Sequence, residues 1–175
     1  MNFMHTRFVP NSIFLVLILS LPFVFKPYAV SQTSMEPALA DGDIILVDRV
    51  SHHFFSPHRG EIVVLHNPHK LVETDVKRVV GLPGETVQVR TTDIVITHAD
   101  GSEETFASST TIGGGMRGAN GVSFTMKLGS EDYFVLGDNR ESSRDSRFFG
   151  AAQSADFMGR ALARVWPLSR FTFSP

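Results

Sequence analysis

Hydrophobic residues follow two different patterns along the chain. From Phe8 to Phe25 there is no charged residue, and Arg7 and Lys26 flank the run. Beyond Lys26, short apolar runs alternate with turn residues, and no long 3.6-residue period appears. The pattern predicts one N-terminal apolar helix followed by an all-β or mainly β domain, without an internal repeat or a second domain boundary.

The apolar run has the length of a membrane span. Its residues would extend about 27 Å as a helix, close to the roughly 30 Å hydrocarbon core of a bilayer. A cleaved signal peptide is the alternative, with a weak cleavage region at 27–29. Length favours a retained anchor. We expect a short cytoplasmic N-terminus at 1–7, an anchor at 8–26 and an extracytoplasmic domain at 27–175, following a mild positive-inside preference.

Short strand patterns fill the predicted domain. They cover 44–50, 61–66, 75–80, 86–90, 94–97, 103–106, 122–128, 133–136 and 159–165. Asp100-Gly101 is typical of a hairpin turn between two of these segments. A stretch rich in Ser, Thr and Gly at 108–121 predicts a loop.

Composition excludes several kinds of chemistry. The formal net charge is −2 with both signs interspersed, which gives no electrostatic basis for binding nucleic acid. The chain has no cysteine, so disulfides, thiolate metal sites and cysteine nucleophiles are excluded. The seven histidines form no His-Glu-x-x-His motif, and there is no Gly-x-Ser-x-Gly elbow. We expect surface histidines, no metal and no cofactor.

Three segments combine reactive groups with turn residues. In the first, Ser34-Met35-Glu36-Pro37, the proline disfavours α conformation at Glu36 and leaves the serine hydroxyl on an irregular segment. A polar linker between anchor and domain is the alternative interpretation.

The second segment is a strand that ends in the turn Gly81-Leu82-Pro83-Gly84. Lys77 and Arg78 must point to opposite faces of this strand, and Lys77 shares its face with Val79. Burial among apolar neighbours lowers the pKa of a lysine and makes it a usable general base. An ordinary lysine on an edge strand is the alternative.

The third segment runs from a strand at 133–136 into a dense polar loop at 137–150. Charged loops at the end of a rigid strand often build active sites. Asp145 and Arg147 are expected to form an ion pair that holds this loop, whereas a solvated turn is the alternative.

Together these segments resemble the signature boxes of type I signal peptidases. The resemblance rests on Ser34-Met35-Glu36-Pro37, on the run from Lys77 to Gly84, and on Gly137-Asp138-Asn139 through Ser143, Asp145, Ser146 and Arg147. Gly42-Asp43, Gly159-Arg160-Ala161 and 166–170 also look like this family. The likeness fails mainly between Arg90 and Lys127, so 91–127 is expected to be a variable hairpin and loop insertion.

The resemblance implies a fold and a set of roles. The fold would be a mainly β, signal-peptidase-like antiparallel sheet domain behind a single transmembrane helix. Ser34 would be the nucleophile and Lys77 its general base, a Ser-Lys pair being a known solution to acyl transfer. Ser143 would orient the lysine. Asp145, Arg147, Asp138 and Asn139 would support the site, and Met35 and Pro37 would contact substrate.

One position departs from the family pattern. Many members carry serine or glycine two residues before the nucleophile, where this chain has Gln32. The oxyanion hole is expected to use the Ser34 backbone N–H, with the Gln32 amide either donating a second hydrogen bond or pointing away.

The resemblance also implies partners and location. Substrates would be preproteins with small residues at positions −1 and −3 from the cut, bound as an added strand. Scattered phenylalanines and Trp166 would seat the domain against the lipid bilayer, and the protein export machinery is a further candidate partner. The protein would lie in the cytoplasmic membrane with its catalytic domain outside. Two alternatives remain: a catalytically silent membrane-tethered assembly factor of the same fold, and a self-cleaving regulator, which would need an N-terminal DNA-binding module.

Overall fold

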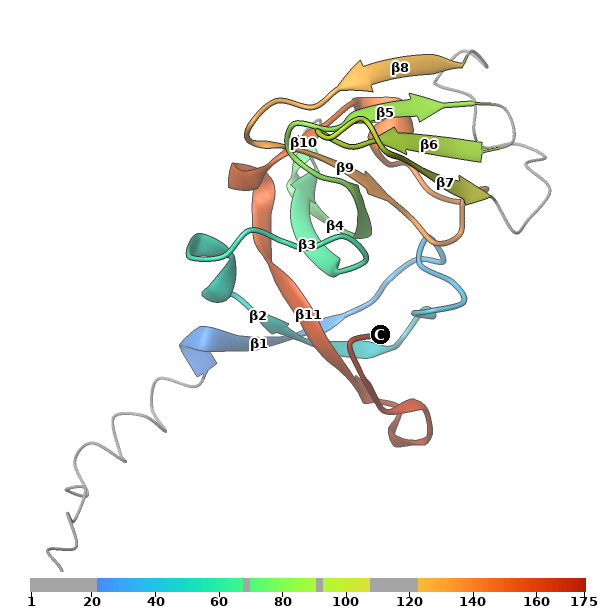
Figure 1. The fold of residues 1–175 in the computed structure, drawn as a ribbon. Helices are drawn as coiled ribbons and strands as arrows, with labels where there is room; N and C mark the ends of the chain where they lie inside the picture. Colours follow the sequence, from blue (N-terminus) through green and yellow to red (C-terminus); the bar gives the residue numbers. More distant parts are fainter. Residues whose placement is uncertain (1–21, 68–69, 91–92, 108–122) are drawn as a thin grey trace, which may run out of the picture.

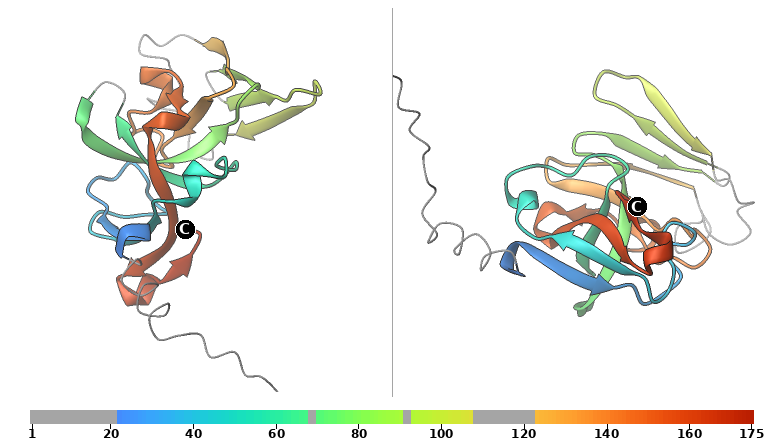
Figure 2. Two further views of the ribbon diagram at one scale, coloured as in Figure 1. Left: turned by 90° about the vertical axis from the view of Figure 1, so that its left-hand side faces the viewer. Right: turned by 90° about the horizontal axis from the view of Figure 1, so that it is seen from below.

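Two antiparallel sheets dominate the structure (Figures 1 and 2). The computed structural model describes residues 22–67, 70–90, 93–107 and 123–175. The larger sheet has the order β1-β2-β11-β3-β4-β9-β10, with β12 paired to β11. Its strands are β1 Phe25–Ala29, β2 Ile44–Asp48, β3 Ile62–Asn67, β4 Lys70–Gly81, β9 Asp132–Leu136, β10 Ala152–Gln153, β11 Phe157–Trp166 and β12 Thr172–Phe173. The prediction of a mainly β antiparallel domain is confirmed.

The smaller sheet has the order β7-β6-β5-β8. Its strands are β5 Thr86–Val89, β6 Asp93–Thr97, β7 Glu103–Ala107 and β8 Phe124–Lys127. The β6–β7 hairpin turns at Asp100-Gly101, where Gly101 has a φ of 84°, as the sequence predicted. Thus the described part of 91–127 adds three strands to β5. The predicted loop at 108–121 lies outside the described residues.

Residues 22–24 are helical and come directly before β1. The other helices of the described part are short and lie at the ends of strands: α2 Ser146–Phe149 and the 3-10 turns η1 Ser51–His53, η2 Ser154–Asp156 and η3 Leu168–Arg170. In the described ranges, no helix combines the length and apolarity that a membrane crossing requires. Most of the predicted anchor, residues 8–21, lies outside those ranges.

The end of the predicted anchor is a strand. Phe25 and Lys26 pair with Asp48 and Val47 as the first residues of β1. An apolar run does not distinguish helix from strand by itself, and an aromatic residue such as Phe25 favours a strand. The apolar run therefore does not continue as one helix to residue 26, its predicted limit.

The strand β4 carries side chains into both layers. Val80 packs with Val87 and Ile96 between the two sheets, whereas Val79 packs with Val63 and Val135 in a separate core of the larger sheet. Because successive strand residues point to opposite faces, β4 is fixed from both sides. A side chain on this strand therefore has little freedom to move.

Candidate active site

Ser34 lies in the irregular connection between β1 and β2. Its neighbours Met35 and Leu39 are buried in the core, and the Leu39 N–H donates to the Met35 carbonyl at 2.9 Å. The Ser34 side chain is itself buried, with 7% of the residue exposed. Packing of Met35 and Leu39 therefore holds the serine in place although it belongs to no helix or strand.

Lys77 is the largest fully buried side chain in the described part of the chain. It lies in β4 opposite Val63 of β3, and only 1% of the residue is exposed. Its Nζ donates to the Ser34 Oγ at 3.2 Å. Arg78, the next residue, points to the other face. The structure thus brings a buried amine within hydrogen-bond distance of a buried hydroxyl across 43 residues of sequence.

Burial lowers the pKa of Lys77 below its ordinary value, because removing water disfavours the charged ammonium. The nearby carboxylates of Asp75 and Asp145 raise the pKa, and the Arg147 guanidinium lowers it. The effect of burial is the largest of these. The amine is therefore more easily deprotonated than a surface lysine, as a general base requires.

The polar loop after β9 is built on a buried ion pair. Arg147 Nε donates to Asp145 Oδ1 at 2.7 Å, and Arg147 Nη2 donates to Asp145 Oδ2 at 2.9 Å. Asp145 also accepts from the Gly137 N–H at 3.0 Å, and Arg147 donates to the Arg140 carbonyl at 2.8 Å. Both charges are fully covered and hydrogen-bonded, so this pair fixes the path of the loop.

The same loop contacts the serine segment directly. The Asn139 N–H donates to the Ser34 carbonyl at 3.0 Å. Beside it, Asp138 forms a two-pronged ion pair with Arg78, with distances of 2.8 Å to Nε and 2.7 Å to Nη2. One turn therefore links the backbone of Ser34 to the strand that carries Lys77.

Ser143 lies at a point of close approach. A side chain at Gly137 would collide with the Ser143 side chain and the Ser34 carbonyl, so only glycine fits there. The Ser143 residue is 4% exposed, and its Oγ has no hydrogen-bond partner among the described residues. The expected hydrogen bond from Ser143 to Lys77 is thus not formed in this structure. Its orienting role stays a prediction.

Gln32 adopts an unusual backbone conformation. Its φ is 129°, a region that L side chains rarely occupy, and its N–H donates to Asp41 Oδ1 at 3.0 Å. The side chain is exposed. Such strain often accompanies functional sites and costs about 1–3 kcal/mol. The position suits glycine, which agrees with the family pattern described above.

Two hollows flank the Ser34–Lys77 pair. A small one of about 40 Å³ is lined by Ser34, Met35 and neighbours from β1 and β4. A wider one of about 250 Å³ is lined by Lys77 and by Ser142, Arg144 and Phe148 of the polar loop. Met35 thus lies where substrate contact was expected, whereas Pro37 is exposed and outside both linings.

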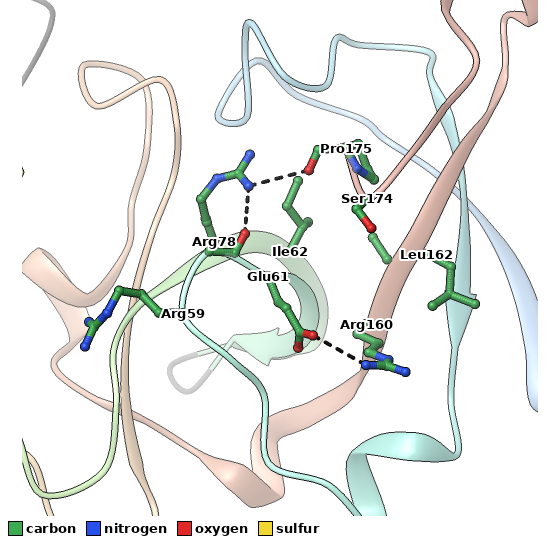
Figure 3. Close-up of a pocket in the computed structure, with 10 residues that line it drawn as sticks. Arg59, Glu61, Ile62, Arg78, Arg160, Leu162, Ser174 and Pro175 are labelled. Carbon is green, nitrogen blue, oxygen red and sulfur yellow. Dashed lines mark hydrogen bonds and ion pairs between the residues drawn. The ribbon is translucent and has the colours of Figure 1, made fainter.

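A larger cavity lies elsewhere. Its volume is about 490 Å³, and Figure 3 shows its lining by Arg59, Arg78 and Arg160. These cations are already engaged: Arg78 donates to the Gly60 carbonyl at 2.8 Å, and Arg160 lies 3.4 Å from Glu61. The cavity contains neither Ser34 nor Lys77, so we do not assign the chemistry to it.

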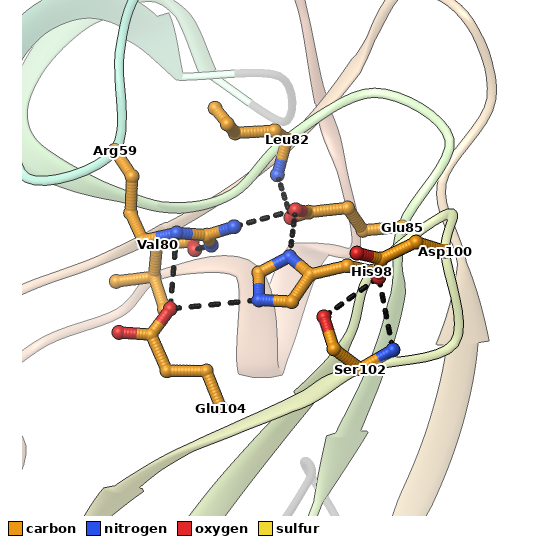
Figure 4. Close-up of polar contacts among 8 residues, drawn as sticks. All are labelled: Arg59, Val80, Leu82, Glu85, His98, Asp100, Ser102 and Glu104. Atoms are coloured by element: carbon orange, nitrogen blue, oxygen red, sulfur yellow. Dashed lines mark hydrogen bonds and ion pairs between the residues drawn. The ribbon is translucent and has the colours of Figure 1, made fainter.

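A second charged cluster joins the two sheets. Figure 4 shows Glu85 between Arg59, at 2.5 Å, and His98 Nδ1, at 2.8 Å. Glu104 of β7 lies 3.5 Å from Arg59. These contacts fix the β6–β7 hairpin to the loop before β3. In the described ranges no group of three His, Cys, Asp or Glu residues is placed to hold a metal ion.

The sequence reasoning missed Asp75. Its Oδ1 lies 3.9 Å from Lys77 Nζ, and it lines both hollows. The available signal was its position two residues before Lys77, which places both side chains on one face of β4.

Comparisons with known proteins agree with the motifs. The family model described as signal peptidase, peptidase S26, matches residues 5–166. A protein named signal peptidase I from Leptolyngbya laminosa is 36% identical over 156 residues, covering 85% of this chain and 72% of its own length. Signal peptidase I V of Bacillus subtilis is 34% identical, covering 78% of this chain and 83% of its own. A crystal structure of a signal peptidase I from Enterococcus faecalis is 28% identical, with a TM-score of 0.47, and the match covers 61% of this chain and 97% of that one.

Proposed function

The chain belongs to the signal peptidase S26 family of serine peptidases, and from this premise we propose that it removes signal peptides from exported preproteins with a Ser34–Lys77 dyad. The observation that carries the proposal is the 3.2 Å separation between Lys77 Nζ and Ser34 Oγ, both buried. The dyad also supports an active peptidase over the silent assembly factor, because burying an unused lysine is costly.

The proposed mechanism follows from this geometry. Neutral Lys77 takes the proton of Ser34 Oγ as that oxygen attacks the scissile carbonyl. The lysine then gives the proton to the leaving amine, and an acyl group remains on Ser34. In the second half, Lys77 deprotonates the water that hydrolyses the acyl-enzyme. The Ser34 backbone N–H would stabilise the negative charge on the carbonyl oxygen.

The shape of the site supports selection of small side chains. The hollow beside Ser34 has a volume of about 40 Å³, against about 250 Å³ for the wider hollow beside Lys77. Met35 closes it from the core and cannot move without opening a cavity. We therefore propose that cleavage follows alanine-sized residues at −1 and −3.

We further propose a membrane setting for the enzyme, with the segment before β1 as an anchor and the catalytic domain on the outer side. Large apolar side chains are exposed together near the end of β11 and in β12. They are Trp166, Leu168, Phe171 and Phe173, and all but Phe171 are more than half exposed. Exposed apolar clusters of this kind often mark lipid contact.

The test is cleavage of a preprotein with an Ala-x-Ala site by the purified full-length protein in lipid vesicles, followed by N-terminal sequencing of the product. We expect cleavage after the second alanine, and a loss of at least about 10³-fold in kcat for Ser34→Ala. Thr33→Ala is the matched control, because it removes an exposed neighbouring hydroxyl. Cleavage by Ser34→Ala at the wild-type rate contradicts the dyad, and turnover that is unchanged without lipid or detergent contradicts the membrane setting.

The role of Gln32 is tested by two substitutions. Gln32→Ala removes the amide and keeps the strained φ, whereas Gln32→Gly removes both. If the amide donates to the oxyanion, both variants should lose about 10²-fold in kcat. Gln32→Gly should also be more stable than Gln32→Ala by about 1 kcal/mol in urea unfolding. Wild-type kcat in both variants would remove the side chain from the mechanism.

A further inference from the structure

Asp75 lies against the buried amine from the same strand. Its Oδ1 is 3.9 Å from Lys77 Nζ, and its side chain is 12% exposed. Asp75 Oδ2 accepts a hydrogen bond from Asn67 Nδ2 at 2.9 Å. Asn67 ends β3 and Asp75 lies in the neighbouring β4, so the carboxylate is fixed by two strands rather than being free to rotate into solvent.

The other groups around Lys77 are engaged differently. Asp145 is bound on both oxygens by Arg147 and also accepts from the Gly137 N–H. Ser143 Oγ makes no hydrogen bond among the described residues. The lysine amine thus lies 3.9 Å from the Asp75 carboxylate and 3.2 Å from the Ser34 hydroxyl.

The wider hollow beside the amine holds further charges. Glu73, on the same face of β4, and Arg144, from the polar loop, both line it. Both residues are exposed. Water screens such charges, so their influence on a buried amine is weaker than that of the largely buried Asp75 carboxylate at 3.9 Å.

We propose that Asp75 is a positioning residue for the general base: its carboxylate directs the Lys77 amine toward Ser34 and sets the pH range in which the enzyme works. This inference rests on the proposed function, because it needs Lys77 to act as the base. It assigns to Asp75 a role that the motif comparison leaves to Ser143.

The two effects of the carboxylate are linked. Its negative charge favours the protonated amine and so opposes the effect of burial on the pKa of Lys77. A higher pKa leaves less neutral lysine at low pH but makes the neutral form a stronger base. Without Asp75, the lysine would stay neutral at lower pH and act as a weaker, less well-directed base.

The experiment is the pH profile of kcat/KM on the preprotein for the full-length wild type, Asp75→Asn and Glu73→Gln. In Asp75→Asn, the acid limb of the profile, where kcat/KM falls as the pH is lowered, should move down by about one pH unit. This is the low end of the pKa shift that an opposite charge causes at about 4–6 Å. The plateau of kcat/KM at high pH should fall, because the lysine is then a weaker and less well-directed base. Glu73→Gln removes the same charge from the same strand face and should leave the acid limb in place.

A second uncharged variant keeps the test decisive if Asp75→Asn does not fold. Asp75→Thr has high strand propensity and should show the same downward shift, whereas Asp75→Glu keeps the charge and should retain a limb near that of wild type. The proposal is overturned if Asp75→Asn or Asp75→Thr folds and its acid limb stays where the wild type has it. It is also overturned if Asp75→Asn, Asp75→Thr and Asp75→Glu all fold and all are inactive. Inactivity of the wild type, or activity in Ser34→Ala, would instead refute the proposed function itself.

Discussion

Replacing Lys77 with methionine is expected to abolish cleavage and at the same time to stabilise the protein. Cleavage should fall by at least about 10³-fold, because the Lys77 amine that contacts the Ser34 hydroxyl at 3.2 Å is removed. The free energy of unfolding at pH 7 should rise by about 1–3 kcal/mol, since methionine fills a similar volume without the cost of burying an ammonium. The structure supports this, because burial is the dominant influence on the lysine and lowers its pKa.

The sign of the pH dependence follows from the same fact. The pKa of Lys77 is lower in the folded protein than in the unfolded chain, where it is near 10.4. Below the pKa that Lys77 has in the folded protein, the wild type bears the full free-energy cost of burying a charged ammonium. As the pH rises from there toward about 10.4, the folded lysine has released its proton while the unfolded chain still holds one, so wild-type stability recovers. The advantage of Lys77→Met should therefore shrink between neutral pH and pH 10.4.

Urea unfolding at several pH values measures this difference. Lys127→Met is the matched control, because Lys127 is exposed and its charge should contribute little. A Lys77→Met variant less stable than wild type at pH 7 would contradict the expectation, and cleavage that survives in it would mean that another group acts as the base.

Removing one partner of the buried pair Asp145–Arg147 is expected to destabilise the fold by about 3–5 kcal/mol. In Arg147→Met, the Asp145 carboxylate would stay buried with two backbone donors, the N–H groups of Gly137 and of residue 147. The side chains of both residues are 0% exposed, so water cannot replace the lost hydrogen bonds. The polar loop should then loosen, and because Asn139 holds the Ser34 carbonyl, kcat should fall as well.

The measurement is urea unfolding of Arg147→Met, Asp145→Leu and the double variant. The double variant should lose less than the sum of the single variants, because it leaves no unpaired charge. Arg90→Met serves as the control, since Arg90 pairs with Asp93 at the surface and should be worth about 0–1 kcal/mol. Equal losses of unfolding free energy in Arg90→Met and Arg147→Met would show that the buried ion pair contributes no more to stability than the surface pair.

Local sequence patterns predicted much of this fold. Alternation placed Lys77 and Arg78 on opposite faces, and the Asp100-Gly101 turn identified the β6–β7 hairpin. The strand β1 escaped prediction because its first residues, Phe25 and Lys26, continue an apolar run that reads equally well as helix. Short strands such as β10 and β12 carry too few residues to show a period.

The candidate site was predictable in its residues but not in its contacts. Motifs pointed to Ser34 and Lys77, yet their separation depends on the packing of three distant segments, which no local pattern encodes. The positive φ of Gln32 could not be read from a residue type that rarely adopts it. Asp75 was overlooked because a charged residue in a strand usually faces solvent, although its position two residues before Lys77 places both side chains on one face of β4.

The link between the Asn139 N–H and the Ser34 carbonyl also has a consequence for how the protein matures. It closes a loop that includes most of the folded chain, and such long-range contacts form late because their loop-closure entropy must be overcome first. A nascent or partly folded copy therefore has the residues of the dyad without their arrangement. We therefore expect the proposed proteolytic activity to appear only as folding completes.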